Sequence, residues 1–429
     1  MEYSLDLFKP LTRDQRQEIG RQTWIKSKCN GTLVYPTGVG KTRTALNCIT
    51  SVLRKYNNFK VLIVVPTETL KNQWQKELDE RELQFNCEVQ IINTVIKHNW
   101  SINILVLDEC HRFASDDFSK VFQKVKYKYI LGLTATFERL DGKEVLISKY
   151  CPVIDTITTE EALFNGWINQ FVEYQVLIDV PDINEWYKLN KEFTEHFEFF
   201  GFDWDIVKKM TGKNGYKYRL ALRDKLCVTS DTTIRSHVLK NITYHAMGFM
   251  RTMAQRKKFI NNHPKKLEIV KKIIEARKDC KIITFSNNVK MAEAVGIGEV
   301  YTGKTSKKKG RITIEEFNTK QTGVLNTCQK ANEGLDIKGL NIAIIFGLDS
   351  SRNKAIQRRG RAIRLNPNSD KPAEIFNIII NNTVESKWFL NSHQNDKFIT
   401  IDEANLEKVL RGEEYNTYKK PIQKLDFRF

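Results

Sequence analysis

The heptapeptide at residues 36–42, which reads PTGVGKT, stands between an apparent strand and an apparent helix. Its glycines would let backbone N–H groups close around phosphates, and the helix N-terminus adds a positive dipole. Lys41 would then reach the β- and γ-phosphates, and the Thr42 hydroxyl would contact Mg²⁺. The loop departs from the GxxxxGK[ST] pattern because Tyr35 occupies the first glycine position. The sequence predicts a nucleotide site lined by Thr37, Gly38, Val39, Gly40, Lys41 and Thr42.

Two adjacent carboxylates follow the apolar run Asn103–Leu107, in the tetrapeptide Asp108-Glu109-Cys110-His111. A carboxylate at the end of a parallel strand lies where a second Mg²⁺ contact is needed, so Asp108 is predicted to bind the metal. Glu109 would orient and polarise the attacking water. A solvated acidic turn is the alternative interpretation. The phosphate-binding loop upstream in the same α/β unit favours ATP hydrolysis.

Strands that alternate with helices must position these groups. In the first third of the chain, short apolar runs alternate with amphipathic stretches, which indicates βαβ units and a parallel sheet. The expected strands are 32–35, 61–65, 88–92, 104–107 and 129–133, with helices at 42–55 and 68–82. The rhythm returns later, with expected strands at 281–285, 323–325, 342–346 and 374–380. The sequence therefore predicts an α/β fold with two parallel sheets.

Charge and composition narrow the class of partner. The 429 residues include 69 Lys and Arg against 51 Asp and Glu, a formal net charge of +18. This surplus suits a polyanion, nucleic acid before an anionic membrane, although a solvated basic surface is the alternative. None of the eight cysteines forms a CxxC pair, which argues against zinc fingers and disulfide frameworks. With no apolar signal core and no run near the ~20 residues of a membrane span, we expect a cytoplasmic protein without membrane contact.

The strand rhythm breaks at about residues 184–262, where polar and aromatic helical stretches appear. Aromatic residues crowd the beginning of this segment and include Phe199, Phe200 and Trp204. These rings either stack on bases or form the core of a small helical module, and their helical spacing favours the core. The basic residues that follow would contact phosphates; they are Lys208, Lys209, Lys213, Lys217, Arg219, Arg223 and Lys225.

The signals, taken in order along the chain, resemble the motifs of superfamily 2 helicases and translocases. Motifs I, Ia, II, III, IV, V and VI correspond to Pro36–Thr42, Val65–Thr67, Asp108–His111, Leu133–Thr136, Ile283–Ser286, Thr327–Asp336 and Gln357–Arg364. The run Gly132–Gly142 and the segment Gly166–Tyr174 are similar to DNA translocases of the XPB and phage UvsW type. The resemblance implies two RecA-like parallel-sheet motor domains with a helical module between them, and ATP and Mg²⁺ bound in the cleft.

The resemblance also assigns residues far along the chain to the nucleotide. The spacing of Arg361 and Arg364 places two guanidinium groups on one helix face. The resemblance makes them arginine fingers from the second domain, with Gln357 beside them. A solvated basic helix is the alternative. The other residues assigned to the nucleotide are Gln15, as adenine reader, and Gly334 and Asp336 of motif V.

Nucleic-acid contacts are expected on both motor domains. The resemblance assigns them to Pro66, Thr67, Thr94, Gly303, Lys304, Arg311 and Thr327. Phosphate contacts need cations and backbone amides and no base code, and the lysine-rich segment 303–311 offers both. A solvated basic face is the alternative interpretation of that segment.

The expected divisions are a first motor domain at 1–165, a crossover and helical module at 166–262, a second motor domain at 263–400 and a C-terminal tail at 401–429. The segment Gln423–Phe429 resembles peptides that replication proteins insert into a sliding clamp, although a tail packed on the motor is favoured. The resemblance implies a monomeric ATP-dependent DNA helicase that remodels forked or branched DNA, as in branch migration during replication, repair or recombination, in the host cytoplasm if a phage encodes it. The alternatives are an RNA helicase and a non-catalytic nucleic-acid-binding protein.

Overall fold

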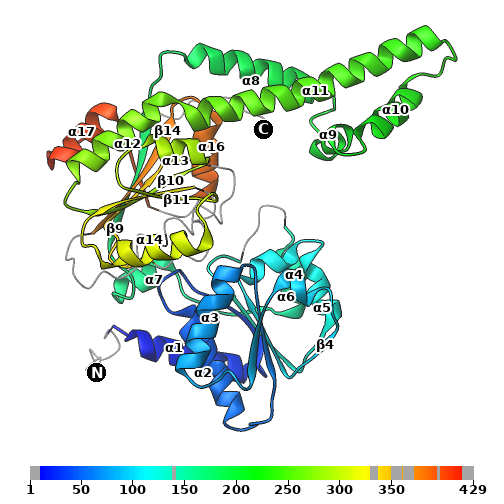
Figure 1. Ribbon diagram of the computed structural model, residues 1–429. Coiled ribbons are helices and arrows are strands. Elements are labelled where there is room, and N and C mark those ends of the chain that lie inside the picture. Colours follow the sequence, from blue (N-terminus) through cyan, green and yellow to red (C-terminus); the bar gives the residue numbers. More distant parts are fainter. Residues whose placement is uncertain are drawn as a thin grey trace, which may run out of the picture.

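The computed structural model describes residues 10–137, 142–328, 337–348, 360, 372–393 and 397–417 (Figure 1). The described residues form two parallel sheets flanked by helices, with an arm of helices that projects beyond the second sheet. This arrangement confirms the predicted α/β class with two RecA-like parallel-sheet domains. No helix in the described ranges has the length and apolar character to span a bilayer.

The first sheet has six strands, in the order β3 (Cys87–Ile91), β2 (Val61–Val65), β5 (Ile104–Asp108), β7 (Tyr129–Thr134), β1 (Asn30–Val34) and β8 (Val153–Thr156). Every pairing is parallel. The residues of β2 and β5 are all buried, because helices cover both faces of the sheet. In Figure 1, α1 (Arg13–Lys26), α2 (Lys41–Leu53) and α3 (Glu68–Glu80) lie on one side of it. The other side carries α4 (Ile92–Val95), α5 (Val121–Lys124) and α6 (Glu144–Tyr150), together with the short pair β4 (Trp100–Ser101) and β6 (Val125–Lys126).

The second sheet has seven strands, in the order β11 (Glu299–Tyr301), β12 (Gly323–Cys328), β10 (Lys281–Ser286), β13 (Ile342–Ile345), β14 (Ala373–Ile380), β9 (Phe171–Ile178) and β15 (Ile399–Asp402). Every pairing here is parallel as well. The helices that accompany this sheet are α12 (Pro264–Ala276), α13 (Val289–Ala294), α14 (Lys307–Thr319), α16 (Val384–Ser392) and α17 (Glu403–Arg411). All four strands expected in this half of the sequence are present.

Strand β9 places the helical segment inside the second domain. It pairs with β14 along its whole length, from Phe171 beside Ala373 to Ile178 beside Ile380. The helical segment begins after β9 and ends at α12, so it is an insertion between two elements of one domain. The sheet also includes β15, which α17 follows. The segments expected at 166–262 and 401–429 therefore each contain a strand of the second sheet. The sequence did not indicate this, because β9 and its partner β14 are about 200 residues apart along the chain.

The arm consists of α8 (Ile183–Glu198), α9 (Trp204–Thr211), α10 (Gly215–Leu226) and α11 (Thr232–Asn262) (Figure 1). Its core is aromatic, with Phe193, Phe197, Phe200 and Phe249 buried together. This core agrees with the favoured interpretation of the aromatic cluster. Trp204 departs from it, because 53% of its surface is exposed.

Candidate nucleotide site and nucleic-acid surfaces

The phosphate-binding loop joins the end of β1 to the start of α2. Gly38 and Gly40 both have φ of 97°, a conformation that side chains rarely adopt. A Cβ on Gly40 would also lie 2.3 Å from Gln17 Nε2. Lys41 begins α2 and its Nζ donates to the Tyr35 carbonyl over 3.1 Å. The loop therefore has the backbone that the two glycines were expected to give it.

Tyr35, which stands where the first glycine of the motif is usual, lies against α1 and β8. Its ring is fully buried, and a Cβ on Gly20 of α1 would meet its hydroxyl at 1.9 Å. The hydroxyl donates to Asp155 Oδ2 over 2.5 Å. Arg16 in turn binds both oxygens of Asp155, at 2.7 and 2.8 Å. The departure from the motif thus ties the start of the loop to two neighbouring elements.

Asp108 ends β5 and is buried near the loop. Trp74 Nε1 donates to its Oδ2 over 2.8 Å, and the Glu109 amide donates to its Oδ1 over 3.0 Å. Burial first and the neighbouring Glu109 carboxylate second raise the pKa of Asp108 to about 6, against the opposing effects of the Trp74 N–H and the charge of Lys41. The buried position of Asp108 therefore disfavours its charged form.

Glu109 follows in the left-handed conformation, with φ of 52°. Its Oε2 is buried and accepts no hydrogen bond from the described residues, and His111 Nδ1 lies 3.5 Å from it. His111 Nδ1 also lies 2.9 Å from Thr134 Oγ1, which donates to the Thr136 carbonyl. Motifs II and III are therefore joined through side chains at the end of the first sheet.

A residue from the second half of the chain reaches this site. A Cβ on Gly360 would lie 2.6 Å from Thr37 Cβ and 2.7 Å from Thr37 Oγ1. The structure thus packs one residue of the motif at 357–364 against the phosphate-binding loop, with room for no side chain. The predicted site residues Gly334, Asp336, Gln357, Arg361 and Arg364 lie outside the described residues.

Family comparisons agree with this layout. Residues 9–100 and 90–139 match the family described as type III restriction enzyme, res subunit, and residues 265–366 match the helicase conserved C-terminal domain. The DNA 3'-5' translocase XPB2 of Sulfurisphaera tokodaii is 26% identical, over 87% of this chain and 82% of its own length. The chain is a superfamily 2 helicase of the XPB-like type. It is accordingly a nucleic-acid-dependent ATPase.

Other relatives resemble this helicase in sequence, and solved structures resemble it in fold. A helicase of Sulfolobus islandicus filamentous virus is 25% identical over 82% of this chain and 61% of its own length. Among solved structures, the Hef helicase domain of Pyrococcus furiosus has a TM-score of 0.52 at 17% identity and covers 90% of this chain and 99% of its own. The Dbp5 structure from S. cerevisiae has a TM-score of 0.58 at 13% identity, with coverage of 95% and 94%. These likenesses confirm the fold.

Two glutamines at the start of α1 have different partners in this helicase. Gln15, the expected adenine reader, accepts from the Thr12 amide through its Oε1 over 2.8 Å and so completes a capping box. Gln17, two residues on, is 1% exposed and donates from Nε2 to the Val39 carbonyl over 3.0 Å. Its Oε1 is buried and accepts no hydrogen bond from the described residues. Sequence reasoning missed Gln17, whose contact with the loop no local pattern reveals.

The expected nucleic-acid contacts of the first domain follow neighbouring strands. Pro66 and Thr67 come directly after β2, and the Thr67 hydroxyl accepts from the Leu70 amide over 3.4 Å to cap α3. Thr94 is exposed on α4, which follows β3. Because β2 and β3 are adjacent and parallel, these residues lie at the same edge of the sheet.

The expected contacts of the second domain divide into exposed and buried residues. Gly303, Lys304 and Arg311 are exposed, around the start of α14. Thr327 is fully buried in β12, and its hydroxyl donates to the Thr284 carbonyl over 2.6 Å. A side chain in this position cannot touch nucleic acid, so the contact expected for Thr327 is not supported. The reason is that motif V begins inside β12, which lies between β11 and β10 in the second sheet.

Proposed function

We propose that this helicase uses ATP and Mg²⁺ to translocate along DNA and to remodel forked or branched DNA. The observation that carries the ATP part is the convergence of Lys41, Asp108, Glu109 and Gly360 at one end of the first sheet. The relative named as a DNA translocase, which aligns over 87% of this chain, supports DNA. The remodelling of branched substrates rests on the resemblance of the sequence to the XPB and UvsW type.

The donor set fits a divalent cation. Thr42 and Asp108 offer oxygen ligands, which Mg²⁺ prefers, and a bound cation would favour the charged form of Asp108, whose pKa burial raises. We propose that these two residues hold the metal and that Lys41 holds the β- and γ-phosphates. When bound, Mg²⁺ would neutralise charge that develops on the phosphates. Glu109, whose buried Oε2 accepts no hydrogen bond from the described residues, would hold the attacking water and take its proton.

Two groups of residues would couple this site to the second domain. Arg361 and Arg364 are proposed as arginine fingers, with Gln357 beside them, and Gly334 and Asp336 as further nucleotide contacts. Gly360 supports this assignment, because this described residue of motif VI packs on Thr37 of the phosphate-binding loop. Gln15 would read adenine once the nucleotide displaces its capping bond, whereas Gln17 would hold the loop itself.

The proposed path of the nucleic acid uses exposed residues of both domains and the arm. Pro66, Thr67, Thr94, Gly303, Lys304 and Arg311 would contact the backbone of the strand. Lys208, Lys209 and Lys213 are exposed on and after α9 and would contact phosphates outside the motor. A sliding clamp that binds the C-terminal segment and a monomeric state remain part of the proposal, and the segment lies outside the described residues.

RNA is the second candidate substrate. A protein of African swine fever virus named as an ATP-dependent RNA helicase is 29% identical over 32% of this chain, and a Methanocaldococcus jannaschii protein of the same description is 23% identical over 83%. Steady-state ATPase assays with single-stranded DNA, duplex DNA, forks, four-way junctions and RNA would decide between them. DNA remodelling predicts the strongest stimulation by forks or junctions. Stimulation by RNA alone would reject DNA as the substrate, and stimulation by neither would reject the proposal.

A further inference from the structure

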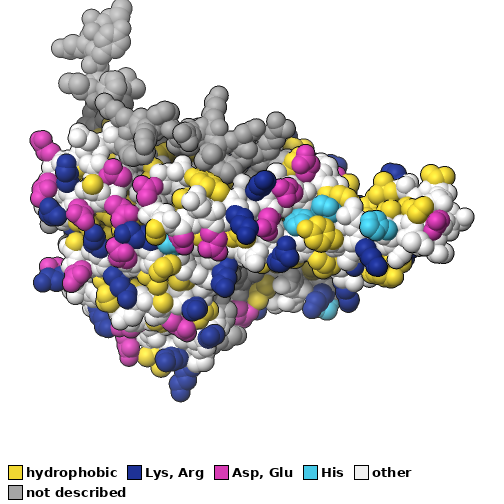
Figure 2. All heavy atoms as spheres, turned by 90° about the horizontal axis from the view of Figure 1, so that it is seen from above, with side chains coloured by type: hydrophobic (Ala, Val, Ile, Leu, Met, Phe, Trp, Pro, Cys, Tyr) yellow, Lys and Arg dark blue, Asp and Glu magenta, His cyan; other side chains and the backbone are white. Residues whose placement is uncertain are grey.

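Helices α9 to α11 of the arm carry charge that is unusually one-sided. From Trp204 to Asn262 the sequence holds thirteen lysines and arginines against three aspartates. Helix α11 contains no acidic residue over its 31 residues. Figure 2 shows basic, histidine and hydrophobic side chains along the arm, with few acidic ones at its outer end. A surface of this kind attracts polyanions before neutral or basic partners.

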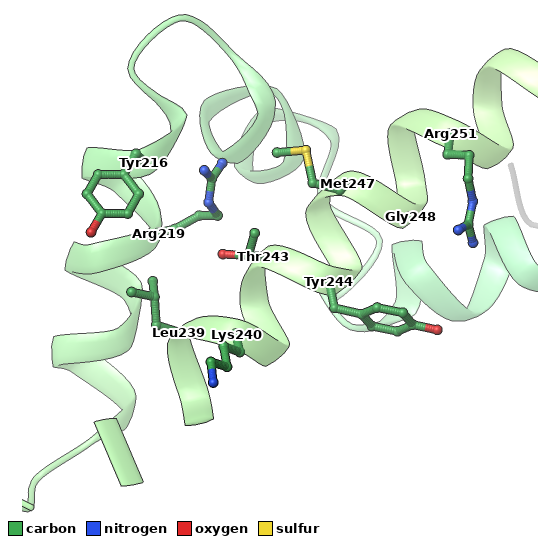
Figure 3. A pocket seen from close by; sticks show the side chains of 9 residues that line it. All are labelled: Tyr216, Arg219, Leu239, Lys240, Thr243, Tyr244, Met247, Gly248 and Arg251. Atoms are coloured by element: carbon green, nitrogen blue, oxygen red, sulfur yellow. The ribbon is translucent and has the colours of Figure 1, made fainter. Parts of the chain in front are cut away.

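A groove of about 650 Å³ lies on this basic arm, along the exposed face of α11 beside α10. Its lining is mainly apolar and includes Tyr216, Tyr244 and Met247, with the cations Arg219, Lys240 and Arg251. Figure 3 shows that Tyr216 and Arg219 come from α10, whereas the other labelled side chains come from α11. Arg219 and Met247 point toward the space between the two helices, and Tyr244 points away from α10.

The two tyrosines expose more than half of their surface at opposite flanks of this groove, and Tyr244 also contacts the rings of His196 and His245 edge to face. Tyr216 is 61% exposed and Tyr244 is 59% exposed, although both occur in ordered helices. The floor is low at Gly248, where a Cβ would lie 2.2 Å from the His196 ring packed beneath it. Exposed rings beside cations and an apolar floor suit flat, electron-rich groups attached to an anionic chain.

We propose that this groove binds unpaired bases of a single-stranded nucleic acid, with Tyr216 and Tyr244 as stacking surfaces. Ring faces can stack only on bases that have left a duplex, so the groove would hold the strand that the motor separates or displaces. Lys240 and Arg251 would bind the flanking phosphates. Arg251 lies 4.0 Å from Glu192 of α8, so one acid borders this end of the groove. The inference rests on the proposed nucleic-acid function but assigns a contact that the motor motifs do not provide.

Abasic oligonucleotides test this assignment, because they keep the phosphates and remove the bases. The full chain would be titrated into fluorescein-labelled oligonucleotides of about 16 nucleotides, in thymidine, uridine and abasic forms, with anisotropy as the readout. The variants are Tyr216→Ala/Tyr244→Ala and the ring-retaining pair Tyr216→Phe/Tyr244→Phe. Tyr187→Ala is the matched control, because Tyr187 is also exposed, at 40%, but lies outside the groove.

The double alanine variant should lose at least about 10-fold in affinity for the thymidine or uridine oligonucleotide and none for the abasic one. The phenylalanine pair and Tyr187→Ala should bind all three like the wild type. Equal losses on the abasic oligonucleotide, or no loss at all, would overturn the proposal. A synthetic peptide of residues 418–429 tests the C-terminal tail as the alternative occupant. The proposal would also be overturned if this peptide bound the wild type but not the double alanine variant, and if neither oligonucleotide displaced it. ATPase assays of the wild type with and without DNA or RNA are run in parallel to test the motor function separately. A lack of stimulation in these assays would count against the motor function, whereas the binding results above would not.

Discussion

At the residue scale, the features that depart from common patterns are the informative ones. Tyr35 replaces a glycine and is held by Asp155 and Arg16, so the phosphate-binding loop is anchored to its surroundings through a side chain. Glu109 keeps one buried carboxylate oxygen without a hydrogen bond from the described residues. Buried polar atoms without a hydrogen bond are rare in folded proteins, and a catalytic role is one explanation for them. Both residues belong to the candidate nucleotide site: Tyr35 precedes the phosphate-binding loop, and Glu109 follows β5.

Substitutions of Lys41 and Glu109 should separate ATP binding from ATP hydrolysis. Lys41→Ala should abolish ATP hydrolysis and weaken ATP binding, because a single positive charge on the phosphates is lost. Glu109→Gln should still bind ATP but lower kcat by about 10²- to 10⁴-fold, since the amide cannot take a proton. Fluorescent-nucleotide binding and steady-state hydrolysis measure the two effects. Wild-type turnover by Glu109→Gln would show that another group acts as the base.

Within the network of Tyr35, Asp155 and Arg16, the loss of Arg16 should cost more stability than the loss of the Tyr35 hydroxyl. Tyr35→Phe removes one hydrogen bond and should cost about 1 kcal/mol in the free energy of unfolding. Arg16→Leu leaves Asp155 without its cation and should cost more, about 3 kcal/mol, because the carboxylate is 14% exposed and loses its charged partner. Urea unfolding measures both. An equal cost for the two variants would mean that Arg16 contributes only its packing.

At the element scale, the second sheet depends on a strand that precedes the arm. Sequence patterns predicted nine strands that the structure contains, because apolar runs between polar segments mark buried parallel strands clearly. They did not predict that β9 belongs between β14 and β15, because strand order in a sheet is set by packing between distant segments. For the same reason they could not find Gln17, whose partner Val39 is 22 residues away.

A fragment of residues 166–417 should therefore fold cooperatively, whereas a fragment of residues 263–417 should not. The shorter fragment lacks β9, an interior strand that pairs with β14 over eight residues and with β15. Its loss would expose apolar residues of β14 and an unpaired strand edge, which favours aggregation. Thermal melting followed by circular dichroism tests both fragments. Cooperative melting of the shorter one would show that β14 and its neighbours suffice.

The arm should loosen as the pH falls. His196 Nδ1 and His245 Nδ1 lie 3.2 Å apart, a contact that only one proton can bridge. Burial lowers the pKa of His196, with Arg251 adding to the effect and Glu192 and Glu195 opposing it. Burial also lowers the pKa of His245, with His196 contributing. Because the unfolded imidazole titrates near 6.5, unfolding takes up protons, so the stability of the arm is present above that pH and is lost as the pH falls below it.

Amide hydrogen exchange of α8 and α11 between pH 7.5 and 5.5 measures this effect, after correction for the intrinsic exchange rate. His245→Gln should flatten the pH dependence, because the amide can still hydrogen-bond but does not titrate. His237→Gln, at an exposed position on α11, is the matched control and should behave like the wild type. A pH dependence that survives His245→Gln would place the titrating group elsewhere.

At the scale of the whole molecule, basic charge is concentrated on helices α9 to α11 of the arm, while the motor domains carry the motifs. Affinity for nucleic acid should therefore depend strongly on salt and weakly on sequence. Changing Lys208, Lys209 and Lys213 to Glu should reduce the slope of log affinity against log salt and weaken binding to branched DNA. Basal ATPase activity should not change. The control carries the same charge change at Lys55, Lys76 and Lys126, which are exposed on the first domain. Equal losses in both triple variants would mean that net charge alone decides affinity.

The segment between the two sheets has a mechanical consequence. Trp167 is held to the first domain, because its carbonyl accepts from Arg13 and its indole donates to the Leu11 carbonyl. Four residues later β9 is already bound into the second sheet, beginning at Phe171. So short a connection allows little sliding of one domain past the other, because each residue spans at most ~3.6 Å. Opening and closing must then be mainly rotation about this pivot, and displacement grows with distance from it. The far end of the arm would act as the long end of a lever, with a small change beside the nucleotide becoming a large sweep at its tip.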